Sequence, residues 1–109
     1  MTQLEVIRMI GDVLTEIDVA VGSLMPNDPD LIKLQDLRRL LDSRQLMLSR
    51  QAFDENTERF QDAARELKAV NDDIRARIGR VEDMIGVLHD VRRFLDAVTS
   101  FMTTIGAFA

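Results

Sequence analysis

The sequence contains no cysteine, no tryptophan and no tyrosine. The lack of cysteine excludes disulfide frameworks, thiolate zinc sites and cysteine nucleophiles. With only two prolines and five glycines, the chain is neither collagen-like nor of low complexity. What remains is 46% hydrophobic and 30% charged, which is too apolar for intrinsic disorder at a net charge of −5. We therefore expect one folded domain over residues 1–109.

The chain also lacks the features of nucleic-acid-binding, secreted and membrane-spanning proteins. Its acidic balance disfavours nucleic acid as a partner, because such proteins usually present a basic face. Glu5 and Arg8 interrupt the apolar pattern of residues 1–10, so we expect no secretory signal. The longest uncharged run, residues 97–109, is shorter than the about 20 residues of a membrane-spanning helix. We expect a soluble, cytoplasmic protein.

The pattern of apolar residues predicts helices throughout, because no stretch alternates with the period of a strand. Both prolines lie in Pro26-Asn27-Asp28-Pro29, where Asp28 suits a helix N-cap and Pro29 the first helical position. This turn predicts a helical hairpin of about 3–25 and 29–52. The first helix has a single stripe with three- and four-residue spacing, formed by Ile7, Ile10, Leu14, Ile17, Val21 and Leu24.

The second predicted helix is apolar on two nearly opposite sides. One side contains Met47 and the leucines at 34, 37, 40, 41 and 48, and the other contains Ile32, Leu46 and Phe53. A helix of this kind is usually covered on both sides. It also has a group of arginines that either docks an acidic partner or forms a solvated face neutralised by Asp36 and Asp42; this group is Arg38, Arg39, Arg44 and Arg50.

The turn at Pro26–Pro29, followed by Leu31-Ile32-Lys33-Leu34-Gln35, resembles the helical-hairpin turn of needle and rod subunits of type III secretion systems. The resemblance covers this stretch alone, and the long apolar pattern that follows departs from the short needle subunits. It implies a subunit of a helical assembly.

The C-terminal half contains a sustained heptad frame. Steps of three and four residues from Phe60 meet an apolar residue everywhere except at Arg77; these positions are 60, 63, 67, 70, 74, 77, 81, 84, 88, 91, 95, 98, 102, 105 and 109. Such a frame is typical of a left-handed helical supercoil. It favours one continuous helix of about 57–107, roughly 75 Å long. The alternative is a monomeric four-helix bundle that breaks near Gly79. Between the second helix and this one, residues 52–57 favour a short turn over a stutter, with Asp54, Asn56 or Thr57 as the cap.

A rod of this length leaves its apolar second half uncovered by the shorter hairpin, so we expect it to self-associate, with a dimer favoured. The predicted interface for the same chain or a partner is Val81, Met84, Ile85, Leu88, Val91, Phe94, Leu95, Val98, Phe101, Met102, Ile105 and Phe108. Arg77 either sets the register of the supercoil or extends its charge to the solvent. The uncharged tail within 94–109 packs in an oligomer, docks in a groove of another protein or, least favoured, lies on a membrane surface.

No pattern for catalysis, cofactor binding or metal binding is present. His89 is the only histidine and has no partner at a recognisable spacing. Glu55 and Glu58 form an isolated Glu-x-x-Glu pair in the predicted turn, without a second pair to complete a carboxylate–metal site. We therefore expect no catalytic residue, no cofactor and no metal.

The function expected from these observations is a non-enzymatic helical protein–protein interaction module that self-associates through its C-terminal helix. A small regulator, an adaptor, a chaperone and a toxin-neutralising immunity protein belong to this class. The alternative is a structural subunit of a secretion or phage assembly, and a remote alternative is an all-α carboxylate–metal hydrolase.

Overall fold

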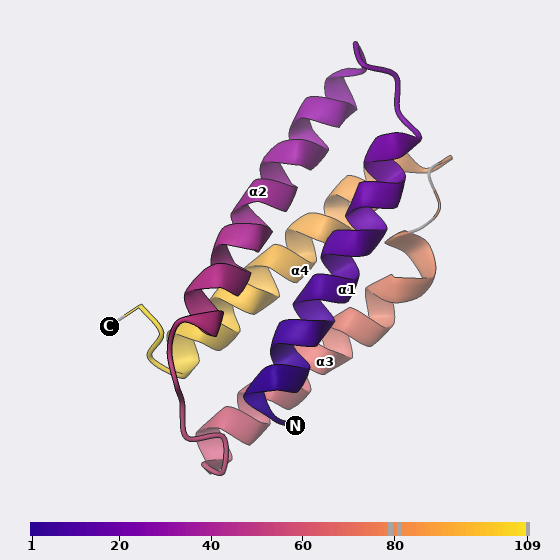
Figure 1. The fold of residues 1–109 in the computed structure, drawn as a ribbon. Helices are drawn as coiled ribbons and strands as arrows, with labels where there is room; N and C mark the ends of the chain where they lie inside the picture. Colours follow the sequence, from indigo (N-terminus) through magenta and orange to yellow (C-terminus); the bar gives the residue numbers. More distant parts are fainter. Residues whose placement is uncertain (79, 81, 109) are drawn as a thin grey trace.

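The computed structural model describes all residues except Gly79, Val81 and Ala109. Within these residues the chain forms four α-helices: α1 (Gln3–Gly22), α2 (Pro29–Ser49), α3 (Glu58–Ile78) and α4 (Met84–Thr104). No strand occurs in this part of the chain, so the all-helical prediction is confirmed. Successive helices run in opposite directions along a bundle with extents of 45 × 24 × 17 Å (Figure 1).

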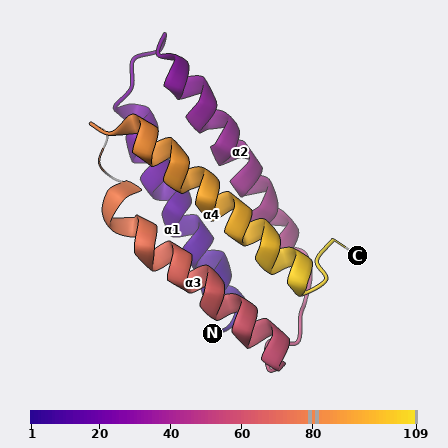
Figure 2. The ribbon, with the colours of Figure 1, turned by 180° about the vertical axis from the view of Figure 1, so that it is seen from behind.

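The four helices form a ring in the order α1, α2, α4, α3. α2 and α3 each pack against both α1 and α4, and they occupy opposite corners of the bundle. The sequential pairs α1–α2 and α3–α4 are antiparallel, whereas α2 and α4 run in the same direction. Figure 2 shows α3 and α4 side by side along most of their length.

The continuous helix predicted for about 57–107 is wrong. α3 ends at Ile78, and α4 begins at Met84 and folds back against α3. Asp83 caps α4 by accepting a hydrogen bond from the Gly86 amide at 3.1 Å. Arg75 and Arg77 lie in the last turn of α3, where positive charge is favourable. Each helix buries its own stripe, which ends with Ile74 and Ile78 in α3 and begins with Val87 and Val91 in α4. Gly79, the predicted break in the alternative fold, lies outside the described residues.

The predicted hairpin and the turn at residues 52–57 are confirmed, with small shifts in the helix ends. Asp28 accepts a hydrogen bond from the Asp30 amide at 2.9 Å, and Pro29 is the first residue of α2. α1 and α2 end at Gly22 and Ser49, earlier than the predicted 25 and 52. Of the three candidate caps of α3, Thr57 accepts the hydrogen bond from the Phe60 amide, at 3.1 Å.

The core lies between the four helices and includes most of the C-terminal heptad frame. Phe60 of α3 and Phe101 of α4 meet edge to face, with ring centroids 5.4 Å apart. The expected cover of α2 on both sides is found on one side only. On the first side, the leucines at 34, 37, 41 and 48 are buried and Met47 is half-buried, but Leu40 is exposed, contrary to the prediction. On the other side, Ile32 and Leu46 are exposed and Phe53 is half-buried against the core.

Glutamine side chains hold together the end of the bundle where α2 connects to α3. Gln3 donates to the carbonyls of Leu48 and Gln51 at 3.1 and 2.6 Å, and accepts from the Phe53 amide at 3.1 Å. Gln61 accepts from the N-terminal amine at 2.7 Å. These bonds satisfy backbone groups that the helix ends leave unpaired. They connect the N-terminus, the end of α2 and the start of α3 through side-chain hydrogen bonds, and we call this the tied end of the bundle.

Candidate functional site

The predicted interface residues mostly lie inside a single chain. Six of them fill the core between α4 and its neighbours: Val91, Phe94, Leu95, Val98, Phe101 and Met102. Met84, Leu88 and Ile105 are half-buried, Ile85 and Phe108 are exposed, and Val81 lies outside the described residues. These six residues are therefore not an uncovered apolar face, because α4 packs against α2 and α3 of its own chain.

Arg77, the register candidate, has a partner that the sequence pattern did not reveal. Its Nε and one terminal nitrogen lie 3.0 and 3.1 Å from the two carboxylate oxygens of Asp90, whose side chain is 4% exposed. Arg77 also donates to Asp73 at 3.4 Å, and Asp73 accepts from Arg93 of α4. The cluster therefore joins the outer part of α3 to α4 and compensates a buried carboxylate.

The hydrogen bonds of this cluster shift two pKa values. The bonds to Asp90 raise the pKa of the Arg77 guanidinium above its ordinary value. Arg93, followed by Arg77, lowers the pKa of the Asp73 carboxyl. Both shifts favour the charged forms, so the cluster is an ion-pair network over a wide pH range and its evident role is structural.

The four arginines proposed as an acidic-partner patch point to different sides of α2. Arg38 contacts Asp18 of α1 at 2.6 Å, and this hydrogen bond raises its pKa. Arg44 lies on the opposite side, with its Nε 3.4 Å from the Thr99 hydroxyl and its guanidinium 5.4 Å from the Phe108 ring. Arg39 and Arg50 are exposed. The structure thus leaves two of the four arginines on the outer face.

The uncharged tail packs against α2 of its own chain. Gly106 has a φ of 83°, and the Ala107 amide donates to the Met102 carbonyl at 2.8 Å, which is the bond of a Schellman cap. Gln51 donates to the Ala107 carbonyl at 3.0 Å. The reversal brings Phe108 to Arg44. No described helix is both long enough and apolar enough to cross a membrane.

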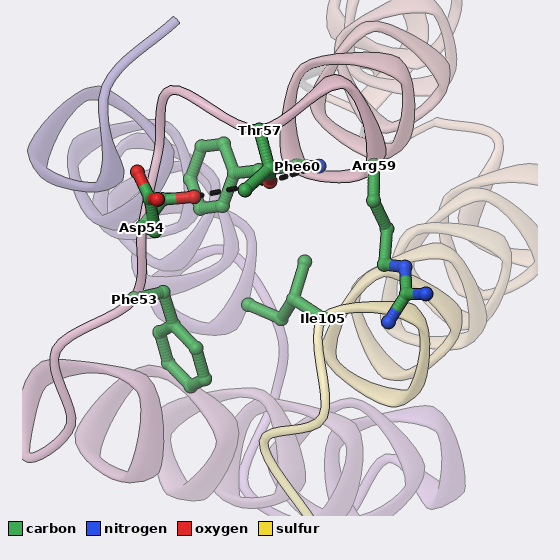
Figure 3. Close-up of a pocket in the computed structure, with 6 residues that line it drawn as sticks. All are labelled: Phe53, Asp54, Thr57, Arg59, Phe60 and Ile105. Carbon is green, nitrogen blue, oxygen red and sulfur yellow. Dashed lines mark hydrogen bonds between the residues drawn. The ribbon is translucent and has the colours of Figure 1, made fainter.

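A pocket of about 370 Å³ lies at the tied end of the bundle, between the α2–α3 connection and the end of α4. Ile105 lies between Phe53 and Arg59, and Thr57 bonds to the backbone of Asp54 (Figure 3). The Asp54 carboxylate accepts from the Asn56 amide at 3.0 Å. The polar groups on this side of the pocket are therefore already used to form the turn and to cap α3. What the pocket offers is a mainly apolar recess with Arg59 at its edge.

The larger hollow is a groove of about 450 Å³ between the parallel helices α2 and α4. Leu37, Leu40 and Leu88 provide its apolar surface. Leu40 is 38% exposed, and Leu88 is half-buried. The other lining residues are charged or titratable and come from both helices: Lys33, Asp36, His89 and Arg92. We name this the α2–α4 groove.

The ion pairs beside the groove are weak. Lys33 is 4.0 Å from Asp30, and Arg92 is 3.7 Å from Asp96, with side chains that are mostly exposed. Exposed pairs of this kind contribute little to stability. The rim charges therefore remain free to exchange these partners for groups on another molecule.

Two exposed isoleucines lie near the first turns of α2 and α4, within four residues of groove residues in the sequence. Ile32 of α2 is 64% exposed and lies one turn before Asp36. Ile85 of α4 is 81% exposed and lies one turn before Leu88 and His89. Residues three or four apart share a helix face, so Ile85 lies on the side of α4 that carries Leu88 and His89. Neither isoleucine lines the groove itself, and Ile32 lies on the outer side of α2, away from Leu37.

The described residues contain no cluster of three or more His, Asp or Glu side chains arranged to hold a metal ion. Comparison with protein-family models, curated proteins and solved structures found no match to this chain.

The groove has no signature in the sequence, because its residues come from two helices that are distant in the chain. The exposed side of α2 was visible as a second apolar line, but the pairing of α2 with α4 was not. The glutamines that tie the opposite end gave no sequence signal, since Gln3 and Gln61 look like ordinary surface residues of helices.

Proposed function

We propose that this chain is a non-enzymatic helical module that binds another protein through the outer face of α2 and the α2–α4 groove. The observation that carries the proposal is the exposure of three large apolar residues on α2: Ile32, Leu40 and Leu46, at 64%, 38% and 48%. Singly exposed apolar residues are ordinary, but several on one helix beside an apolar groove are typical of interaction surfaces.

The partner that fits best is an amphipathic helix. A groove between two parallel helices can accept apolar side chains at helical spacing, here against Leu40 and Leu88. The rim has both signs of charge, with Lys33 and Arg92 opposed by Asp36. A partner with mixed charges flanking its apolar stripe would satisfy this rim better than a purely acidic one.

The test is affinity capture from the source cells with the full chain and a double variant, Ile32→Glu/Leu40→Glu. Two carboxylates would be desolvated against the apolar side chains of the partner, so we expect the captured partner to be lost. The matched control is Leu4→Glu, because Leu4 is 54% exposed on α1 at the tied end of the bundle. Circular dichroism and thermal unfolding check that all variants fold.

A protein retained by the wild type and Leu4→Glu, but lost from the double variant, would support the proposal. Retention by all three would contradict it, as would capture of no protein by any of them. Light scattering on the purified chain distinguishes a partner that is a second copy, and open polymerisation would favour the structural-subunit alternative.

A further inference from the structure

The outer face of α2 points away from the other helices of its own chain. α2 packs against α1 and α4 and occupies the corner of the bundle opposite α3 (Figure 1). Leu40 and Leu46 on this face are 38% and 48% exposed, so apolar surface lies on both sides of the middle of the face. The face is therefore accessible to another molecule along the length of the helix.

The exposed residues of this face are arranged symmetrically about Ser43. Leu40 and Leu46 lie three residues before and after it in the sequence. Asp36 and Arg50 lie seven residues before and after it, and all five side chains are exposed. Seven residues are close to two helical turns, so Asp36, Ser43 and Arg50 share one side of the helix. The face thus has matching apolar residues around its centre and opposite charges at its two ends.

The two halves of α2 differ in the sign of their charge. Residues 28–36 contain three aspartates and one lysine, whereas residues 37–50 contain four arginines and one aspartate. Two parallel copies of this helix would bring like charges together. Two antiparallel copies would bring the acidic half of each helix against the basic half of the other. Charge complementarity therefore favours an antiparallel pair.

The basic half of the face also contains a hollow of about 300 Å³. Its lining residues are Ser43, Leu46, Met47, Arg50 and Gln51. In an antiparallel pair centred on Ser43, Leu40 of one copy lies level with Leu46 of the other, because each is about 5 Å from the centre along the helix. Leu40 of each copy can therefore enter the hollow of the other. The small side chain at position 43 allows the two helices to approach closely.

We infer that the outer face of α2 binds a second copy of the same chain in a symmetric antiparallel dimer, with the twofold axis at Ser43. Such a contact is isologous, so every interaction in it forms twice. Asp36 of each copy lies opposite Arg50 of the other, and Leu40 fills the hollow beside Leu46. A contact confined to one pair of helices is small, so we expect a weak dimer that depends on protein concentration.

The inference rests on the proposed function in one respect, namely that the outer face of α2 is a binding surface. It assigns the part of this face around Ser43 to a second copy of the chain. The α4 side of the α2–α4 groove, with Leu88 and His89, stays open to another protein. The groove would then lie beside the contact between the two copies.

The first test measures the mass of the full chain by sedimentation at increasing protein concentration, where we expect a monomer–dimer equilibrium. Asp36→Arg and Arg50→Asp should each weaken dimerisation by at least about tenfold, because each places like charges opposite one another twice per dimer. The double variant Asp36→Arg/Arg50→Asp restores opposite charges and should recover the dimer. The matched control is Glu66→Arg, which makes the same charge change on the exposed side of α3 and should leave dimerisation unchanged.

The second test uses the absence of natural cysteine. A short bis-maleimide should join Ser43→Cys chains across the twofold axis. The matched control on the same helix is Gln35→Cys, an exposed position whose two copies would lie about 24 Å apart along an antiparallel pair. We expect no crosslink at this distance. In a parallel pair, both positions would be crosslinked.

A chain that stays monomeric at every concentration would overturn the inference. So would a dimer that both single charge variants leave intact, or equal crosslinking at positions 35 and 43. These failures are distinct from a failure of the proposed function, because the capture experiment detects a different protein. A monomeric chain that still captures a partner would overturn the dimer and leave the proposed function standing. A dimer that responds to the charge variants but captures no other protein would do the reverse.

Discussion

α2 and α3 have the same two neighbours and the same length, yet they present different faces to their surroundings. Each has 21 residues, lies at one corner of the bundle and packs against α1 and α4. The outer side of α3 is strongly charged, with exposed Asp62, Arg65, Glu66, Lys68, Asp72 and Asp73. The outer side of α2 exposes Ile32 and Leu46 on either side of Arg39. Both helices have the same two neighbours, although α3 packs mainly against α4 and α2 packs evenly against both, so the identity of the neighbours does not account for this difference.

Apolar residues therefore serve two purposes in these helices: they fill the core, and on α2 they also form part of the surface. On α3 they are confined to the side that faces the core, and several of the surrounding charges pair with α4 or with each other. On α2 they occur on both sides, and only one side is covered by the chain. Substitutions in the two helices should therefore differ in what they damage.

The largest effect is expected for the core side of α3. Leu67 is 1% exposed, and Leu67→Ala should lower the free energy of unfolding by about 2–5 kcal/mol, because it removes buried methyl groups and leaves a cavity. Leu46→Ala on the outer face of α2 should change it by no more than about 0.5 kcal/mol. Urea unfolding measures both. A comparable loss in the two variants would mean that the outer face of α2 contributes to the fold.

A smaller effect is expected for the ion-pair cluster between α3 and α4. Arg77→Leu should lower Tm, because it leaves the buried Asp90 carboxylate without its partner. The double variant Arg77→Leu/Asp90→Leu should recover part of the loss by removing that carboxylate. Thermal unfolding followed by circular dichroism measures both variants. A higher Tm in the single variant would show that the fold does not need this pair.

The ion pairs on the charged face of α3 should also make the thermal stability of the fold depend on pH. The hydrogen bonds from Arg93 and Arg77 lower the pKa of Asp73 below the model-peptide value of 3.8. A group with a lowered pKa stabilises the folded state at pH values above 3.8, and this contribution is lost as the pH falls through the lower folded-state value. Asp73→Asn should therefore reduce Tm near neutral pH and have little effect at strongly acidic pH. An equal reduction at both pH values would indicate a steric rather than an electrostatic cause.

The smallest effect on stability is expected on α2. Ile32→Ser should leave the free energy of unfolding within about 0.5 kcal/mol of the wild type, because Ile32 is 64% exposed. It should shorten retention on a hydrophobic-interaction column, whereas Lys68→Ser on α3 should not. If Ile32→Ser instead destabilises the chain strongly, the exposed side of α2 has a role in folding and the contrast with α3 disappears.

Local signals were the most reliable guide to this fold. Asp28 and Pro29 predicted the start of α2 correctly. The Asp28 cap and the fixed φ of Pro29 act on the backbone within a few residues, so their effect does not depend on the rest of the fold. Thr57 was one of three predicted caps of α3, and only the actual hydrogen-bond geometry selected it. The stripe of α1 was equally clear, because its apolar residues repeat with helical spacing on one side.

The candidate site was only partly visible. Of the second apolar line predicted for α2, Ile32 and Leu46 remain exposed, whereas Phe53 is half-buried against the core. The wall supplied by Leu88, His89 and Arg92 depends on α4 packing beside α2. The partner of Arg77 was hidden for the same reason, since Asp90 comes into reach only when α4 folds back.

The amino-acid sequence alone determined that this chain is helical, where α2 begins, and which residues of each helix are apolar, because these properties depend on neighbours a few positions away. Only the tertiary structure decided that α4 turns back along α3 and that α2 pairs with α4. A heptad frame records which side of a helix is apolar but not the direction in which the next helix runs. That direction follows from the burial gained over the whole bundle.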